Sequence, residues 1–89
     1  MRIKDGFVLR TVCGEHVVVG EGLDTVNFSK LVSLNDTAAW LWEKASEMGD
    51  FTEELLADAL CQEYDVARER AEADIHRNIN KWKEIGLIE

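Results

Sequence analysis

The chain contains 89 residues, of which 46% are hydrophobic, and carries a formal net charge of −8. A chain of this length forms one domain, residues 1–89, with a modest core, which leaves no room for a catalytic domain of ordinary size. The excess negative charge lies within residues 35–66, because the segments before and after it are neutral. Such a surface repels phosphate backbones, which argues against nucleic-acid binding.

The sequence also predicts the compartment. It begins MRIKDGF, without the apolar segment of a secretion signal, and has no run of the roughly 18 apolar residues that span a membrane. Its two Cys are too few for a disulfide scaffold and suit a reducing compartment. We therefore expect a cytoplasmic protein with no membrane partner.

Three strands are predicted before the first helix. The segments 6–12 (GFVLRTV) and 15–20 (EHVVVG) are apolar and β-branched, and Gly14 between them indicates a hairpin with a tight turn near Cys13–Glu15. The segment 27–34 (NFSKLVSL) has the alternation of a strand. One side of it carries Phe28, Lys30, Val32 and Leu34, and the other carries Ser29, Leu31 and Ser33.

Three helices are predicted to follow. Asn35 is a favoured N-cap residue, Asp36 is favourable at the positive end of a helix, and Gly49 ends the first helix. The apolar positions of this helix are Ala38, Leu41, Trp42, Ala45 and Met48.

The second helix is expected to be capped by Asp50 or Thr52, and the third, after EYDV, by Asp65. Gly86 is expected to end the third helix, after which residues 87–88 fold back onto the core. The predicted inner faces are Leu55, Leu56, Ala59 and Leu60 in the second helix, and Ala71, Ile75, Ile79, Trp82 and Ile85 in the third.

Strands grouped ahead of helices predict an α+β domain, here a three-stranded antiparallel sheet followed by a three-helix bundle. Three short strands cannot close a barrel, so the third strand keeps one edge that no later strand covers. Only Lys30 offers the charge that commonly protects such an edge. We expect this edge to accept another peptide.

No pattern in the sequence predicts catalysis, a cofactor or a metal. Cys13 and His16 form a C-x₂-H pair, but Cys61 and His76 lie far away in the sequence, and zinc needs a convincing set of four ligands. Ser–His–Asp spacing, a Gly-rich phosphate loop and H-E-x-x-H are absent from the sequence. We expect a protein that is not an enzyme and uses no cofactor.

Several segments, in order and spacing, resemble the coenzyme PQQ synthesis protein D (PqqD) family, from Gly6 to Ile88. They are GFVLRTVCGEHVVV, SLNDTAAWLWE, YDVARERAEADI and the closing GLI. The resemblance implies a winged-helix-like domain of the type called a RiPP recognition element. Such domains bind the leader of a ribosomally made precursor peptide and deliver it to a modifying enzyme, often a radical SAM protein. The leader is expected to add as a strand, which is ordinary β-augmentation.

The resemblance also implies a peptide-binding site, carried over by position. The edge would consist of Ser29, Lys30, Leu31, Val32 and Ser33, and the groove that faces it of Ile75, Asn78, Ile79 and Trp82. The sequence departs from the family at Asn78, where an apolar or aromatic residue is usual, at Trp82, where Leu is common, and at Ala67, in place of a capping residue. The preferred leader therefore need not be a PQQ precursor, and family membership does not imply PQQ synthesis.

Some residues allow two interpretations. Trp82 either stacks on a leader or, as large aromatic residues more commonly do, belongs to the core. Trp40 cannot share a face with Trp42, so it either contacts a partner or second copy, or packs on the sheet. Charged residues of the third helix form either a solvated face with ion pairs or a strip that steers an acidic leader. They are Arg70, Asp74, Arg77 and Lys81.

Three functions follow for comparison. The first is a non-catalytic peptide chaperone that captures a precursor leader and presents it to a modifying enzyme. The second is a winged-helix regulator that binds DNA, which the acidic middle of the chain disfavours. The third is a structural subunit whose open edge pairs with its own copy to form a homodimer.

Overall fold

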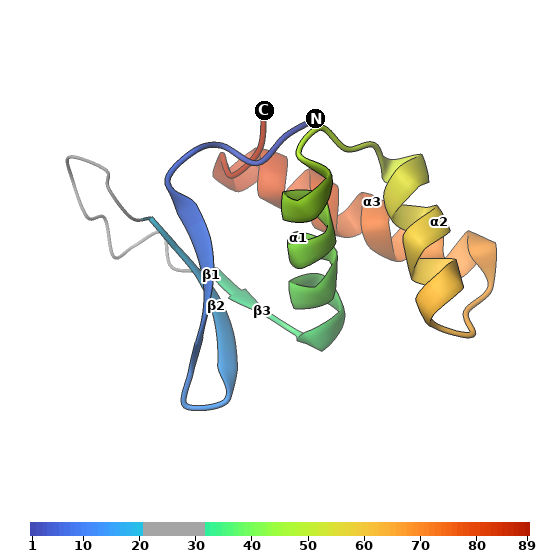
Figure 1. Cartoon of the computed structure of the whole chain (residues 1–89), viewed down its shortest axis with the longest axis horizontal. Coiled ribbons are helices and arrows are strands. Elements are labelled where there is room, and N and C mark those ends of the chain that lie inside the picture. The colour runs from blue at the N-terminus through green and yellow to red at the C-terminus, as the bar shows by residue number, and fades with distance from the viewer. Residues whose placement is uncertain (21–31) are drawn as a thin grey trace.

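The computed structural model describes residues 1–20 and 32–89, and the predicted α+β architecture is confirmed there (Figure 1). Its elements are β1 (Phe7–Val12), β2 (Glu15–Gly20), β3 (Val32–Leu34), α1 (Asp36–Met48), α2 (Glu53–Glu63) and α3 (Arg68–Ile85). The strands form one antiparallel sheet in the order β1-β2-β3, beside the bundle of helices. The remainder of the predicted third strand, residues 27–31, lies outside the described residues.

The β1–β2 hairpin closes through a two-residue turn, as predicted. Cys13 and Gly14 both have positive φ angles, 52° and 79°, which is the pattern of a type I′ turn. This turn matches the right-handed twist of the strands on either side of it, and the pair that closes it is Val12 with Glu15.

Only one face of the sheet packs against the helices. Val18 of β2 lies opposite Val32 of β3, and both side chains are buried together with that of Leu34. Successive side chains of a strand point to opposite faces, so Ser33 is exposed on the other face. Val12 at the hairpin end is 56% exposed. The sheet therefore buries its inner face and leaves its outer face open to solvent near β3.

The first helix begins and ends where its capping residues predict. The side-chain oxygen of Asn35 accepts a hydrogen bond of 2.8 Å from the Ala38 amide, and Gly49 donates its amide to Ala45 at 3.1 Å. The predicted apolar stripe is buried except for Met48, which is 36% exposed at the last turn.

The inner face of α2 is rotated relative to the prediction. Leu55 was expected inside but is 46% exposed, whereas Ala57 was missed and is fully buried with Leu56 and Leu60. The rotation follows from the position of α2, which packs on α3 and touches α1 only lightly. Of the two candidate caps, Thr52 is the one used, and its hydroxyl accepts from the Leu55 amide at 3.1 Å.

The third helix begins later than predicted, because Ala67 and not Asp65 is its N-cap residue. The chain first makes a tight turn in which the Val66 amide donates to the Tyr64 carbonyl at 3.0 Å. Ala67 has no side-chain oxygen, so the first amides of α3 receive no side-chain cap. The expected cap at Asp65 is therefore wrong.

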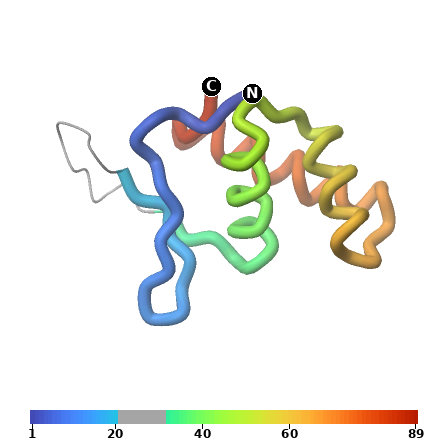
Figure 2. Tube along the Cα trace, viewed as in Figure 1, coloured from blue at the N-terminus to red at the C-terminus, as the bar shows by residue number. Residues whose placement is uncertain are grey.

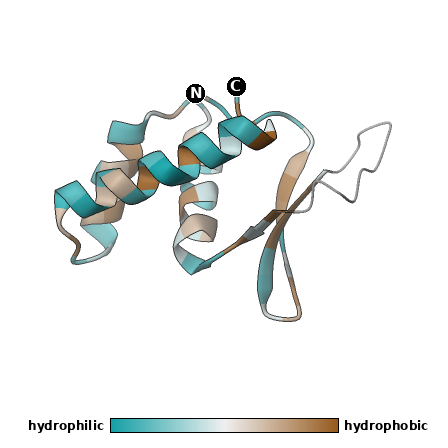
Figure 3. Cartoon of the chain, turned by 180° about the vertical axis from the view of Figure 1, so that it is seen from behind, coloured by the Kyte–Doolittle hydropathy of each residue, from teal (hydrophilic) through white to brown (hydrophobic). Residues whose placement is uncertain are grey.

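The apolar stripe of α3 forms the centre of the core, as predicted. Ala71, Ile75, Ile79 and Trp82 are between 0% and 1% exposed, whereas Ile85, also predicted on this face, is half-buried. Figure 3 shows that hydrophobic and hydrophilic residues alternate along α3. After the helix, Gly86 adopts the left-handed conformation with a φ of 92°, and residues 87–88 fold back onto the core.

Both ends of the chain meet beside the C-terminal end of α1 (Figure 2). The Met1 ammonium donates to a carboxylate oxygen of Asp50 at 3.1 Å and to the Phe51 carbonyl at 2.9 Å. Arg2 and Glu89 exchange two backbone hydrogen bonds of 2.9 Å. The two ends are thus held to each other and to the α1–α2 connection. No helix in the described part of the chain is long and apolar enough to cross a membrane.

Candidate functional site

The pairing of the strands fixes which backbone groups of β3 face outward. The two-residue turn makes Val12 and Glu15 a hydrogen-bonded pair, so the backbone groups of His16 and Val18 point away from β1 and toward β3. In an antiparallel pair these orientations alternate from residue to residue. The partners of His16 and Val18 on β3 are Leu34 and Val32, whose backbone groups therefore face β2.

It follows that Ser33 directs its N–H and C=O to the outer edge of the sheet. Ser33 lies opposite Val17 in the register, at a position where the ladder makes no hydrogen bond. None of the described residues pairs with this side of β3. An extended peptide that adds here would find a donor and an acceptor at Ser33, two residues before Asn35, which caps α1.

Two hollows lie beside this edge. The smaller one has a volume of about 410 Å³ and extends from the hairpin turn to the end of β3, with Ser33 and Asp36 in its wall. The larger one, which we call the end cavity, has a volume of about 720 Å³. It lies where the N-terminal end of α1, the C-terminal end of α2 and the first turns of α3 meet. Its lining consists of Asp36, Thr37, Leu60, Tyr64, Asp65, Val66, Ala67, Arg70 and Asp74.

Asp36 lines both hollows and therefore joins the sheet edge to the third helix. One of its carboxylate oxygens lies 3.0 Å from Nε2 of His16, whose Nδ1 lies 3.2 Å from the Thr11 hydroxyl. These contacts tie β1, β2 and the first residue of α1 together. The side chains that bound the groove are thereby fixed relative to the strand edge.

The structure places the predicted edge residues only in part. Ser29, Lys30 and Leu31 lie outside the described residues. Val32 turns its side chain into the core, so it offers no side chain to a ligand, whereas Ser33 is exposed.

The predicted groove residues of α3 lie mostly inside the protein. Ile75, Ile79 and Trp82 are at most 1% exposed, so their side chains form part of the core beneath any groove. Asn78 is half-buried, and its amide donates a hydrogen bond of 2.9 Å to the backbone carbonyl of Asp74. Asn78 and Asp74 are therefore the positions on this side of α3 that combine partial exposure with a place near the end cavity.

The structure decides between the two interpretations of Trp82 and gives the surroundings of Trp40. Trp82 belongs to the core, where its ring stands edge-on to that of Trp42 with centroids 5.2 Å apart. Trp40 is half-buried and meets Tyr64 edge-on at 5.6 Å, with the Lys44 ammonium 5.5 Å from its ring centroid. Trp40 thus packs against the core and against Tyr64, a residue that lines the end cavity.

Sequence reasoning missed the contribution of the α2–α3 connection to the site. Tyr64 is 50% exposed and lines the end cavity together with Asp65 and Val66. The available signal was an aromatic and an acidic residue directly after a helix that ends without Gly. This pattern marks a turn but not which surface the turn faces, so it could not place these residues near the sheet edge.

The charged residues of α3 pair only in part. Asp74 lies 3.6 Å from a guanidinium nitrogen of Arg77, whereas Arg70 makes no ion pair with any described residue. The α3 surface therefore contains a local ion pair and a separate unpaired guanidinium that lines the end cavity.

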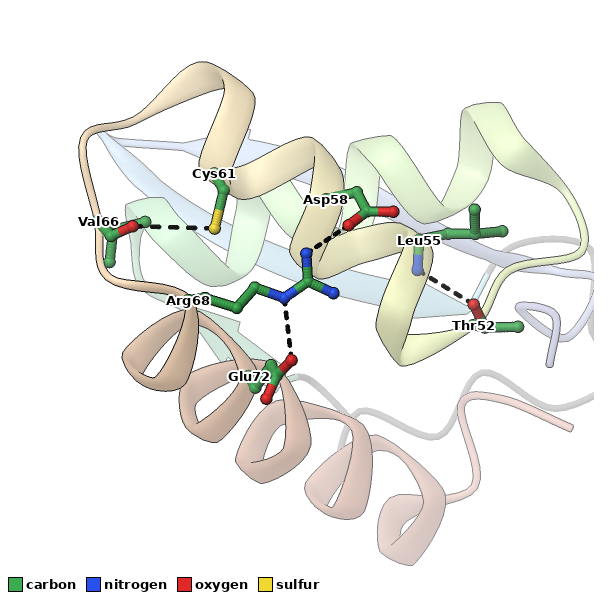
Figure 4. Close-up of polar contacts among 7 residues, drawn as sticks. All are labelled: Thr52, Leu55, Asp58, Cys61, Val66, Arg68 and Glu72. Atoms are coloured by element: carbon green, nitrogen blue, oxygen red, sulfur yellow. Dashed lines mark hydrogen bonds and ion pairs between the residues drawn. The ribbon is translucent and has the colours of Figure 1, made fainter.

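Another hollow lies between α2 and α3, and Arg68 in its wall joins the two helices. Figure 4 shows the contacts of this residue. Arg68 donates hydrogen bonds to Asp58 of α2 and, at 2.9 Å, to Glu72 of its own helix. The hydrogen bond with Asp58, followed by that with Glu72, raises the pKa of the Arg68 guanidinium, which stays charged. Since this residue holds the two helices together, we assign it no ligand. In the part of the chain that the structure describes, no group of three potential ligands is placed to hold a metal ion.

Two solved structures resemble this fold. One is TbiB1 in complex with the TbiA(beta) leader peptide, with 25% sequence identity and a TM-score of 0.75 over 100% of this chain and 95% of that one. The other is lasso peptide synthetase B1 complexed with the leader peptide, with 24% identity and a TM-score of 0.70 over 97% and 93% of the two chains. At 24% identity, the second structure is evidence of a shared fold alone.

A comparison with curated proteins gave no match. The model of one protein family, described as coenzyme PQQ synthesis protein D (PqqD), matches residues 15–88. The match contains β2, β3 and all three helices, and so includes the open edge and the residues that line the end cavity. The chain therefore belongs to the PqqD family.

Proposed function

We propose that this protein is a RiPP recognition element, which binds the leader of a ribosomally made precursor peptide by strand addition to β3 and presents it to a modifying enzyme. The observation that carries the proposal is the unpaired outer edge of β3 at Ser33, beside a groove that continues to α3. The likeness to TbiB1, whose structure contains a leader peptide, supports it. The modifying enzyme, such as a radical SAM protein, is a partner that this chain would serve and not replace.

The site residues take different roles in this proposal. Ser33 supplies a backbone donor and acceptor to the added strand, and such backbone hydrogen bonds are the source of affinity in strand addition. The predicted edge residues 29–31 remain part of this proposed site. Ile75, Ile79 and Trp82 act through the shape and rigidity of the core beneath the groove, since their side chains are buried. Asn78 is the α3 residue of the predicted set that a leader would touch directly.

A role in presentation, without catalysis, fits the chemistry of the site. The hollows beside β3 hold carboxylates, hydroxyls and one guanidinium, and the imidazole near them, His16, is engaged by Thr11 and Asp36. The proposal therefore assigns the covalent step to the partner enzyme. We expect no chemical change in the leader when it is incubated with this protein alone.

The test is binding of a precursor leader, identified by a short peptide gene near this one, measured by the fluorescence anisotropy of a labelled synthetic peptide. In Ser33→Pro the outward N–H is lost and the proline ring blocks the edge, while no hydrogen bond to β2 is removed. One lost hydrogen bond and one unsatisfied partner cost about 1–3 kcal/mol, so we expect binding to weaken at least about tenfold.

Thr11→Pro is the matched control, and it is compared with Thr11→Val, because both lose the hydroxyl beside Nδ1 of His16 and only the proline variant also loses the backbone N–H. By the same alternation, the Thr11 N–H points to the outer edge of β1, on the opposite side of the sheet. Ser33→Pro and Thr11→Pro should both keep a folded far-UV circular dichroism spectrum, and Thr11→Pro should bind the leader as Thr11→Val does. Equal loss of binding in both variants, or none in Ser33→Pro, would contradict strand addition to β3. A dimer seen by light scattering that Ser33→Pro dissociates would assign the edge to self-pairing instead.

A further inference from the structure

The charges that line the end cavity are mostly negative. Asp36, Asp65 and Asp74 contribute carboxylates from three different elements of the wall, and Arg70 contributes the one guanidinium among the lining residues. The adjoining hollow adds Glu15. A ligand that follows the groove from the strand edge to α3 therefore passes through a negative potential.

The carboxylates differ in whether they already have a side-chain partner. Asp36 lies 3.0 Å from His16 and Asp74 lies 3.6 Å from Arg77. Asp65 forms no ion pair with any described residue, and neither does Arg70, which also lines the cavity. Asp65 is thus the carboxylate in this wall that is most available to a cation from a ligand.

Apart from Thr37 and the Tyr64 hydroxyl, the remainder of the wall is apolar. Leu60 is 4% exposed and Val66 is half-buried, while the Tyr64 ring is 50% exposed. Lys and Arg side chains place their methylene groups along such a surface and keep the charged end in a polar environment. An aromatic ring adds an attraction for the same cation. The wall therefore matches a long basic side chain in both its apolar and its charged portions.

We propose, on the basis of the function proposed above, that the leader of this protein carries a Lys or Arg next to its strand-forming segment, and that this residue enters the end cavity toward Asp65. This sign is opposite to the acidic leader that the α3 basic residues suggested from the sequence. The difference arises because Arg77 is engaged by Asp74, and because the α2–α3 connection brings Asp65 into the same wall.

The test is a selection of random peptides displayed on phage, at physiological ionic strength, so that long-range attraction to the acidic chain is screened. Peptides whose binding is lost in Ser33→Pro are those that add to the strand edge. Among these we expect enrichment of Lys or Arg at one position adjacent to the strand-forming segment. The control protein is Glu63→Gln, which removes an exposed charge near the same end of α2 but outside the cavity lining.

The strongest selected peptide then enters a double-mutant cycle, with its basic residue replaced by Met, which is similar in length. This replacement should weaken binding to the unchanged protein about two- to fivefold, which is the range of one exposed ion pair. It should have no effect on binding to Asp65→Asn, whereas with Glu63→Gln the loss should remain. The proposal would be overturned if a selection against Asp65→Asn enriched the same basic residue as a selection against the unchanged protein. It would also be overturned if the peptide replacement and Asp65→Asn weakened binding independently, so that their fold-changes multiply in the double mutant.

The possible results distinguish failure of strand addition to β3 from failure of the preference for a basic side chain. If no selected peptide depends on Ser33, strand addition fails and the basic side chain has no strand beside which to lie. If peptides depend on Ser33 but carry no basic residue coupled to Asp65, strand addition stands and only the charge preference is overturned.

Discussion

Trp82 offers a sharp test of how the core is built. Its indole nitrogen is buried, and among the described residues it is the one buried side-chain polar atom without a hydrogen-bond partner. Trp42 is its edge-on neighbour, is 2% exposed and does not share this defect. Replacing each with Phe in turn removes the same group from the two members of one pair.

The expected free energies of unfolding follow from this difference. Replacing Trp by Phe removes roughly 40 Å² of buried apolar surface, which costs about 1 kcal/mol, and leaves a small cavity that costs about another 1 kcal/mol. In Trp82→Phe the removal of an unsatisfied buried donor raises the free energy of unfolding by about 1–3 kcal/mol, which offsets part of this cost. We therefore expect Trp42→Phe to lose about 2 kcal/mol and Trp82→Phe to lose about 1 kcal/mol or less.

Urea unfolding followed by far-UV circular dichroism measures both variants, since the substitutions alter the tryptophan fluorescence itself. With a slope of about 1 kcal/mol per molar urea for a small domain, the two midpoints should differ by about 1 M or more. A loss in Trp82→Phe as large as that in Trp42→Phe would refute the reasoning, because it would mean that the Trp82 N–H has a partner in solution.

Two further predictions concern the helix ends. Asn35→Ala removes the acceptor that lies 2.8 Å from the Ala38 amide, so it should lower the free energy of unfolding by about 1 kcal/mol in urea unfolding. Because Asn35 also joins β3 to α1, this variant should weaken leader binding as well. The control is Thr52→Ala, which loses the equivalent cap of α2 and should leave leader binding unchanged. Ala67→Ser supplies the side-chain cap that α3 lacks, and the extended backbone at this position suits a capping residue. The variant should therefore raise the free energy of unfolding by about 1 kcal/mol. A lower urea midpoint for this variant would contradict the assignment of Ala67 as N-cap.

The elements of this fold were predictable where local chemistry decides them. Asn35, Gly49 and Gly86 fix helix ends through their own side chain or backbone freedom, and the structure confirms all three. Where a boundary depends on a turn formed by several residues, local chemistry failed. Asp65 has the better capping side chain, yet the turn at residues 64–66 delays α3 to the position after Ala67.

The candidate site was less predictable because it depends on tertiary packing. Leu55 and Ala57 exchange places relative to the prediction because α2 packs mainly on α3, a choice that no periodicity of α2 alone reveals. Trp82 follows the same rule, since a position that faces a groove and a position that faces the core have identical helical spacing. The end cavity needs three helix ends to meet, so its charge could not be assigned from the sequence.

The meeting of both chain ends at the far end of α1 has a practical consequence. The helix has 13 residues and rises 1.5 Å per residue, so the corner where Met1 bonds to Asp50 lies roughly 20 Å from Asp36 at the groove. A tether attached at either terminus would leave from that one corner and run clear of the strand edge. Fluorophores, surface linkages or a fused enzyme could therefore be joined at the C-terminus, which leaves the Met1 ammonium and its bonds to Asp50 and Phe51 intact.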